Sequence, residues 1–136
     1  MKIKQKFNLL DCTLRDGGYY NNWNFSLELI QDYLNAISKT NIKYVELGFR
    51  GFFKNKNIGI IGITDDSLIK KLKFPDSLKI GVMVNASDLY SNNYSPLKNL
   101  KRLFPQINRK IVFVRFACHA EEVFGLKEVI DWLSKK

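Results

Sequence analysis

The chain has 136 residues, of which 46% are hydrophobic, so it has the size of one domain and enough apolar side chains for a core. It contains no run of about 18 apolar residues, so no membrane partner is expected. The formal net charge is +9, but the lysines are scattered over predicted helices and loops and form no recognised nucleic-acid-binding motif. We therefore expect a solvated basic surface and no nucleic-acid partner.

The first half of the chain alternates between apolar runs and helical spacing. Residues 7–13 predict a strand, and residues 17–24 predict a loop rich in turn formers and aromatic side chains. Ser26 is a predicted N-cap for a helix that continues to about Thr40. A second strand is predicted over residues 42–49, followed by a loop over residues 50–63.

The second half repeats this alternation. Thr64 is the predicted cap of a second helix, and Ser95 with Pro96 opens a third. The last helix is predicted to start near Glu121, with an apolar face formed by Val123, Leu126, Ile130 and Leu133. The other expected elements are strands over residues 78–84 and 110–116, and a polar loop over residues 85–94.

The element order is therefore strand–helix, repeated four times. Nearly continuous apolar strands that alternate with helices are typical of a parallel sheet covered by helices, so the fold class is α/β. A doubly wound sheet would usually carry a Gly-x-Gly-x-x-Gly turn after its first strand, and this turn is absent.

Polar side chains follow each predicted strand. The carboxyl ends of parallel strands meet at one rim, where function gathers in such folds. Arg15 and Asp16 follow the first strand, and the pair Gly17 and Gly18 predicts a sharp turn there. The remaining candidates at the rim are Glu46, Gly48 and Arg50 from the second strand, Asn85 from the third, and Arg115, Cys118 and His119 from the fourth.

Glu46 lies in an otherwise apolar strand. Alternation places Tyr44, Glu46 and Gly48 on one face, and Val45, Leu47 and Phe49 on the opposite face, which suits packing under helices. Glu46 would then point to the interior of the barrel or cleft. A buried carboxylate needs a partner, and Arg15 is the candidate.

Each of these residues also has a purely structural interpretation. Arg15 and Asp16 could form an ion pair that pins a loop, Arg115 could pair with a neighbouring carboxylate, and His119 could cap a helix. Cys12 and Cys118 have no evident base beside them, so they are expected to be small core residues rather than nucleophiles. With only two cysteines and no metal-type spacing, we expect reduced thiols and a cytoplasmic protein.

Residues 11–19, Asp-Cys-Thr-Leu-Arg-Asp-Gly-Gly-Tyr, resemble the first-strand signature of the metal-dependent aldolase–lyase superfamily with TIM-barrel catalytic domains. That group includes 4-hydroxy-2-oxovalerate aldolase, hydroxymethylglutaryl-CoA lyase, and the isopropylmalate and homocitrate synthases. Residues 45–48 and 114–121 resemble the second and fourth strands of the 4-hydroxy-2-oxovalerate aldolase branch.

The resemblance implies a role for each matched residue. Asp16 would be a ligand of Mn²⁺ or Mg²⁺, Arg15 would hold the oxygen that becomes an enolate, and Glu46 would brace the arginine. The other polar residues of the predicted rim, Asn85, Arg115 and His119, are candidates to contact the substrate, which the resemblance implies is a 2-oxo acid or aldehyde. The implied reaction forms or cleaves a carbon–carbon bond through a pyruvate-type enolate, which a metal and a guanidinium would stabilise.

The sequence departs from this family at two places. Tyr19 stands where the aldolase branch has a histidine base, so Tyr19 would take over proton transfer or the substrate would differ. The chain has one histidine and therefore lacks the His-x-His pair of metal ligands. Because a TIM barrel needs about 250 residues, residues 1–136 are expected to be the truncated N-terminal (β/α)4 half of the catalytic domain.

An open half-barrel exposes sheet edges and apolar interior, so we expect self-association. The isolated chain is expected to bind metal weakly and to lack aldolase activity. The alternative function is a non-catalytic half-barrel module that associates with itself or with a partner chain.

Overall fold

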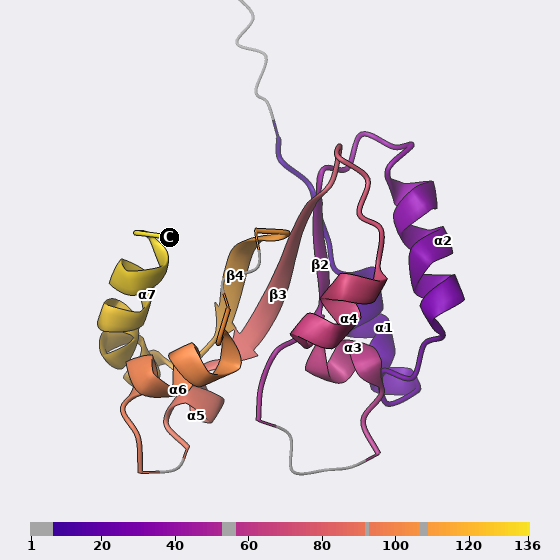
Figure 1. Cartoon of the computed structure of the whole chain (residues 1–136). Coiled ribbons are helices and arrows are strands. Elements are labelled where there is room, and N and C mark those ends of the chain that lie inside the picture. The colour runs from indigo at the N-terminus through magenta and orange to yellow at the C-terminus, as the bar shows by residue number, and fades with distance from the viewer. Residues whose placement is uncertain (1–6, 53–56, 92, 107–108) are drawn as a thin grey trace, which may run out of the picture.

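The computed structural model describes residues 7–52, 57–91, 93–106 and 109–136. Four strands form one parallel sheet in the order β1-β2-β3-β4. The strands are β1 (Leu10–Asp11), β2 (Tyr44–Phe49), β3 (Lys79–Asn85) and β4 (Ile111–Ala117). Helices alternate with these strands, so the chain forms an α/β half-barrel, as expected (Figure 1).

The helical segments fall between and after the strands. The first two helices of the chain directly continue β1, and α2 then runs antiparallel to the sheet. The segments are α1 (Thr13–Gly17), the 3-10 helix η1 (Gly18–Tyr20), α2 (Leu27–Ile37), α3 (Ile60–Ile63), α4 (Asp66–Lys71), α5 (Ala86–Leu89), α6 (Pro96–Leu103), the 3-10 helix η2 (Ala120–Leu126) and α7 (Lys127–Leu133).

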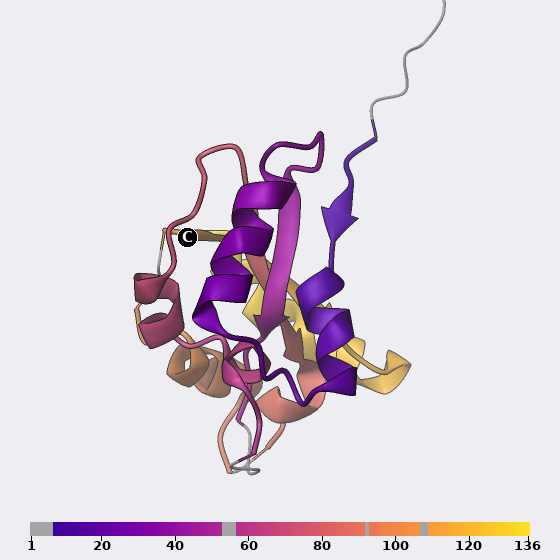
Figure 2. The same ribbon diagram turned by 90° about the vertical axis from the view of Figure 1, so that its right-hand side faces the viewer.

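Two apolar clusters hold the helices to the sheet. In the first cluster, Ile30 and Leu34 of α2 pack with Val45 and Leu47 of β2, and Figure 2 shows α2 lying along β2. The second cluster joins β3 to α6 and α7, through Val82, Val84, Leu100, Leu103 and Val129. Each of these side chains is buried, and burying a Leu or Ile side chain stabilises the fold by about 1.5–3 kcal/mol.

Two predicted helix starts are confirmed. The Ser26 Oγ accepts a hydrogen bond from the Leu29 N–H at 3.1 Å, and the Ser95 Oγ accepts one from the Lys98 N–H at 3.3 Å. The predicted cap at Thr64 is wrong, because Thr64 ends α3 with a left-handed φ of 41°. Asp65 caps α4 instead, accepting a hydrogen bond from the Leu68 N–H at 2.8 Å.

The sharp turn predicted at Gly17 and Gly18 is also wrong. Both residues are helical, with φ values of −62° and −60°, and the chain continues from α1 directly into η1. Gly18 is required for a different reason, since a Cβ atom there would lie 1.9 Å from the ring of Trp23. The glycine therefore makes room for an indole.

The boundaries of several other elements also differ from the prediction. The first strand is much shorter than residues 7–13, and Asn85 ends β3 rather than opening a loop. A short helix, α3, forms inside the predicted loop 50–63, and α5 forms inside the predicted loop 85–94. Residues 53–56 and 92 of these loops lie outside the described residues.

The predicted apolar face of the last helix is partly wrong. Leu126 is buried as expected, but Val123 and Ile130 are about half exposed, and Val129 is fully buried in their place. The physical reason is a change of helix type. Residues 120–126 form a 3-10 helix with about three residues per turn, so one 3.6-residue period does not continue through Lys127.

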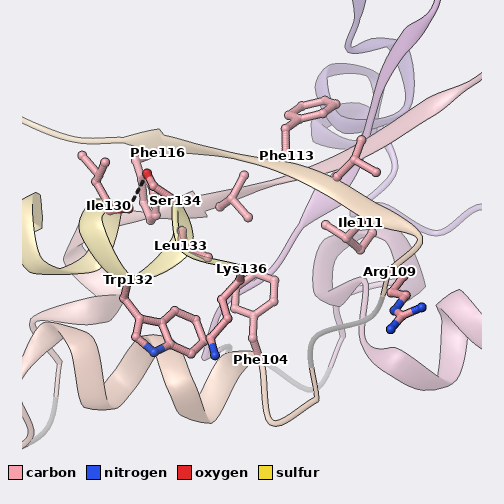
Figure 3. A pocket seen from close by; sticks show the side chains of 12 residues that line it. Phe104, Arg109, Ile111, Phe113, Phe116, Ile130, Trp132, Leu133, Ser134 and Lys136 are labelled. Atoms are coloured by element: carbon pink, nitrogen blue, oxygen red, sulfur yellow. Dashed lines mark hydrogen bonds between the residues drawn. The ribbon is translucent and has the colours of Figure 1, made fainter.

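The sheet has two edges in the described part of the chain, β1 and β4. Beside β4 lies a mostly apolar hollow of about 720 Å³ between the strand and α7 (Figure 3). Side chains that line it include Phe104, Ile111, Phe116, Ile130, Trp132 and Leu133. None of the helices in the described residues has the length and apolar character of a bilayer-spanning helix.

We expect this exposed edge and hollow to make the chain self-associate. Val112 of β4 is more than half exposed and lines the hollow, so Val112→Lys places a charge on the association surface. Sedimentation velocity over a range of concentrations should show larger species for the wild type and fewer for the variant.

The matched control is Leu29→Lys, which adds the same charge at an exposed leucine of α2. This control should associate like the wild type. A wild-type chain that sediments as a monomer at all concentrations would contradict the expectation.

Candidate active site

The site is built around the carboxylate of Glu46, which lies on β2 and has no solvent exposure. The Arg15 Nε donates a hydrogen bond to Glu46 Oε1 at 2.6 Å. On the other side, the Arg115 Nε lies 2.7 Å from Glu46 Oε2 in an ion pair that lacks hydrogen-bond geometry. A charge buried this deeply requires such partners, because desolvation costs several kcal/mol.

Three elements of the fold contribute to this cluster. Arg15 comes from α1, which begins directly after β1, Glu46 comes from β2, and Arg115 comes from β4. The prediction that Glu46 points inward and pairs with Arg15 is confirmed. With Arg115 as a second partner, the single Glu46 carboxylate is paired with two guanidinium groups.

Arg15 is held at four points. Besides Glu46, its Nη1 lies 2.6 Å from Asp16 Oδ1, its Cζ lies 5.6 Å from the centre of the Phe49 ring, and its carbonyl oxygen accepts a hydrogen bond from the Trp23 Nε1–H at 2.8 Å. Burial alone would lower the pKa of Arg15, but the hydrogen bond and charge of Glu46 and the charge of Asp16 raise it above its usual value. The guanidinium is therefore a permanent, oriented cation.

Cys12 belongs to this cluster, which sequence reasoning missed. Burial raises the pKa of its thiol, and the negative charge of Glu46 raises it further, while the positive charge of Arg115 lowers it. Glu46 is already paired with Arg15 and Arg115 and raises the pKa of the thiol, which is consistent with the expectation that Cys12 is not an activated nucleophile. The sequence signal for its place in the cluster was the position of Cys12, one residue after β1 and three residues before Arg15.

Cys118 is exposed, so its predicted place in the core is wrong. Both cysteines are free thiols.

An aromatic wall borders the arginine, formed by Tyr19, Trp23 and Phe49. The ring centres of Tyr19 and Trp23 are 4.8 Å apart, and those of Trp23 and Phe49 are 5.5 Å apart, both edge-to-face. Tyr19 and Phe49 are 6.3 Å apart. The wall was not expected from the sequence, because strict alternation placed Phe49 on the helix-covered face.

A bulge in β2 explains the difference. The pairing of β2 with β3 shifts register between Glu46 and Phe49. Leu47 stays in the core with α2, and a Cβ on Gly48 would collide with the backbone of Ile61 in α3. The extra residue therefore reverses the alternation, so that Phe49 lies on the side of Arg15. The glycine within the strand was the sequence signal for this bulge.

The bulge also directs Arg50 away from the site. Its Nη2 lies 2.5 Å from Asp66 Oδ1 of α4, and its guanidinium lies over the Phe104 ring at 4.5 Å. Arg50 therefore links α4 to Phe104, the residue that ends α6.

The remaining predicted site residues lie at the rim. Asp16 is 60% exposed and pairs with Arg15, and Tyr19 is 62% exposed and packs against Trp23 and Phe49. Asn85 ends β3 and is partly buried. His119 is exposed and caps η2, where its backbone N–H donates to Glu122 Oε2 at 2.7 Å. Three structural interpretations are therefore observed: the Arg15–Asp16 pair, the Arg115–carboxylate pair and the capping role of His119.

The described residues alone do not form a complete site for a divalent metal. Within them, no group of three His, Cys, Asp or Glu side chains lies together as a metal site requires. Mg²⁺ and Mn²⁺ favour octahedral sets of oxygen ligands. Asp16 offers one carboxylate, and that carboxylate is paired with Arg15. This chain could supply one protein ligand of such an ion.

The structure is thus a parallel half-barrel in which Arg15, Glu46 and Arg115 form one charged cluster. The chain is similar to a crystal structure described as the N-terminal domain of a "putative aldolase" from Bacteroides vulgatus, with a TM-score of 0.79 and 30% sequence identity. The match covers 94% of this chain and 42% of that chain, so this chain spans less than half of that protein's length. No protein-family model and no curated protein matches the chain.

We expect Glu46→Gln to destabilise the fold most among the three members of the cluster. Removing one partner of a buried pair leaves an uncompensated charge, which costs about 3 kcal/mol. Arg115 is 41% exposed and Arg15 is 11% exposed, so Arg115→Gln should cost least. Urea unfolding followed by circular dichroism measures the order. Equal stability of Glu46→Gln and the wild type would contradict a structural role for the cluster.

We expect Cys12 to react with iodoacetamide more slowly than an unperturbed thiol. Its raised pKa leaves less thiolate at a given pH, so its rate should keep rising at a pH where an ordinary thiol has already reached its plateau. Cys118→Ser isolates Cys12, and Cys12→Ser provides the matched control with the exposed Cys118. Mass spectrometry across a pH series measures both rates. Identical profiles would show that burial and Glu46 do not act on the Cys12 thiol.

Proposed function

We propose that the chain is the N-terminal half of the catalytic domain of a divalent-metal-dependent aldolase or lyase that acts on a 2-oxo acid. The observation that carries this proposal is the Arg15 guanidinium, held on the buried Glu46 at the strand ends of a fold shared with an aldolase domain. An activity of the 4-hydroxy-2-oxovalerate aldolase type is the specific form of the proposal.

The reaction proposed is a reversible aldol cleavage. The bond between C3 and C4 of a 4-hydroxy-2-oxo acid breaks, the proton of the C4 hydroxyl leaves, and C4 becomes the aldehyde carbon. The electron pair of the broken bond passes to C3 and the C2 carbonyl as an enolate. A proton added at C3 then gives the second product, a 2-oxo acid, so no further reactant is needed.

The residues of this chain have separate roles in that reaction. Arg15 holds the C2 oxygen as negative charge develops on it, and Glu46 keeps the guanidinium in position. Arg115, Asn85 and His119 bind the carboxylate and neighbouring polar groups of the substrate. Tyr19 lies at the rim beside Arg15, where its hydroxyl moves the proton.

Asp16 is the single protein ligand that the chain offers to Mn²⁺ or Mg²⁺, with the remaining ligands expected outside it. When bound, the metal would supply positive charge for the enolate oxygen. Because a carboxylate has two oxygens, Asp16 could hold the metal with one of them and keep its Oδ1 paired with Arg15. We therefore expect the isolated chain to bind metal weakly and to lack aldolase activity.

The test is binding of pyruvate to the chain, measured by ¹H–¹⁵N NMR titration. The Trp23 indole N–H donates to the Arg15 carbonyl, so its resonance reports on the arginine. Arg15→Lys keeps the charge but loses the planar two-pronged donor, and should weaken binding about tenfold.

Arg102→Lys is the matched control, since Arg102 stacks on Phe52 and Tyr94 and takes no part in the cluster. It should bind pyruvate like the wild type. If pyruvate does not bind, or if Arg15→Lys has no effect, the proposal is wrong.

A second candidate is a non-catalytic module that associates with itself or a partner chain. The apolar hollow beside β4 favours it, since such surfaces mark association sites (Figure 3). If the wild-type chain self-associates but does not bind pyruvate, this second function is favoured.

A further inference from the structure

The aromatic wall of Tyr19, Trp23 and Phe49 leaves one ring open. Tyr19 contacts both other rings edge-to-face, yet it remains 62% exposed. Phe49 is buried behind it, and Trp23 is partly buried. The wall therefore presents the Tyr19 ring to a molecule that occupies the rim.

The wall is held in place by specific interactions. The Trp23 indole donates to the Arg15 carbonyl, and its ring packs directly on Gly18. Asn22 and Trp23 both adopt left-handed backbone, with φ values of 54° and 58°. Non-glycine residues in this region carry strain, which persists where the surroundings fix them and which often accompanies a functional site.

The wall begins beside the cation that holds the substrate. The centre of the Phe49 ring lies 5.6 Å from the Arg15 Cζ, and the Tyr19 ring follows 6.3 Å from Phe49. The Phe49 ring therefore connects the Arg15 guanidinium to the Tyr19 ring, and a ligand with its carboxyl end at Arg15 would extend along the wall toward Tyr19.

We propose that the substrate carries an aromatic group beyond its 2-oxo acid end, and that Tyr19 is the residue that selects it by stacking. This inference rests on the proposed function, because the carboxyl end must lie at the arginines. The corresponding aldol is a 4-aryl-4-hydroxy-2-oxobutanoate, which cleaves to pyruvate and an aromatic aldehyde. Edge-to-face or offset stacking of rings favours this pairing over an aliphatic tail.

The test compares two ligands that differ only in the ring, 4-phenyl-2-oxobutanoate and 2-oxobutanoate. Neither carries the C4 hydroxyl, so neither undergoes aldol cleavage during the titration. Binding is measured by ¹H–¹⁵N NMR of the full chain, with the Trp23 indole N–H as the reporter. The variant Trp132→Phe assigns that resonance, because the chain has two tryptophans.

We expect the phenyl ligand to bind about tenfold more tightly, with a ring-current shift at Trp23. Tyr19→Ala should abolish this preference, so that the two ligands bind this variant with equal affinity. The matched control is Tyr20→Ala, which removes the adjacent tyrosine, 96% exposed and outside the wall, and should keep the preference.

Equal affinities of the two ligands, a preference that survives Tyr19→Ala, or a preference that Tyr20→Ala also removes would each overturn the inference. The proposed function stands in these cases as long as Arg15→Lys still weakens 2-oxobutanoate binding. If neither ligand binds, both the inference and the proposed function fail.

Discussion

The burial of the Glu46 carboxylate is the constraint on which the rest of the site depends. A carboxylate with no solvent exposure is stable only with oriented positive partners, and Arg15 and Arg115 supply them from two other segments. The pairing of β2 in the sheet places Glu46 between these arginines, and removing one partner would leave a buried charge uncompensated. The same arrangement that satisfies Glu46 also fixes the Arg15 guanidinium at the strand ends.

The contacts that satisfy the buried Glu46 also fix the position of the Arg15 guanidinium. Arginine loses little freedom when it binds a ligand if its side chain is already held, and Arg15 is held by Glu46, Asp16 and the Phe49 ring. Because Glu46 is shared with Arg115, a change at either arginine alters the partner of the other. The cluster is therefore one coupled unit rather than a set of separate binding residues.

The apolar sides of the helices are packed against the sheet, whereas the edge strand β4 borders an apolar hollow. Two apolar clusters cover the helix side of the sheet, while β4 and α7 leave an apolar hollow at one edge (Figures 1 and 3). The strand order β1-β2-β3-β4 brings Arg15, Glu46 and Arg115 together, and Arg115 comes from β4, the strand at that edge. The charged cluster is thus formed entirely by residues of this chain.

The sequence by itself determined the fold class and the central pair of the site. Strand–helix alternation, the caps at Ser26 and Ser95, and the isolated charge of Glu46 in an apolar strand are local signals. A buried charge requires a partner, and the nearest arginine after the first strand was the correct one. These features follow from short-range periodicity and from the cost of burying charge.

Only the tertiary structure decided which other side chains join the site. The bulge in β2 depends on its pairing with β3, and it directs Phe49 inward and Arg50 outward. The place of Cys12 beside Glu46 and the packing of Trp23 on Gly18 arise from contacts between segments far apart in sequence or folded back on themselves. Alternation along one strand cannot reveal such contacts, because they depend on register and on what the neighbouring element packs against.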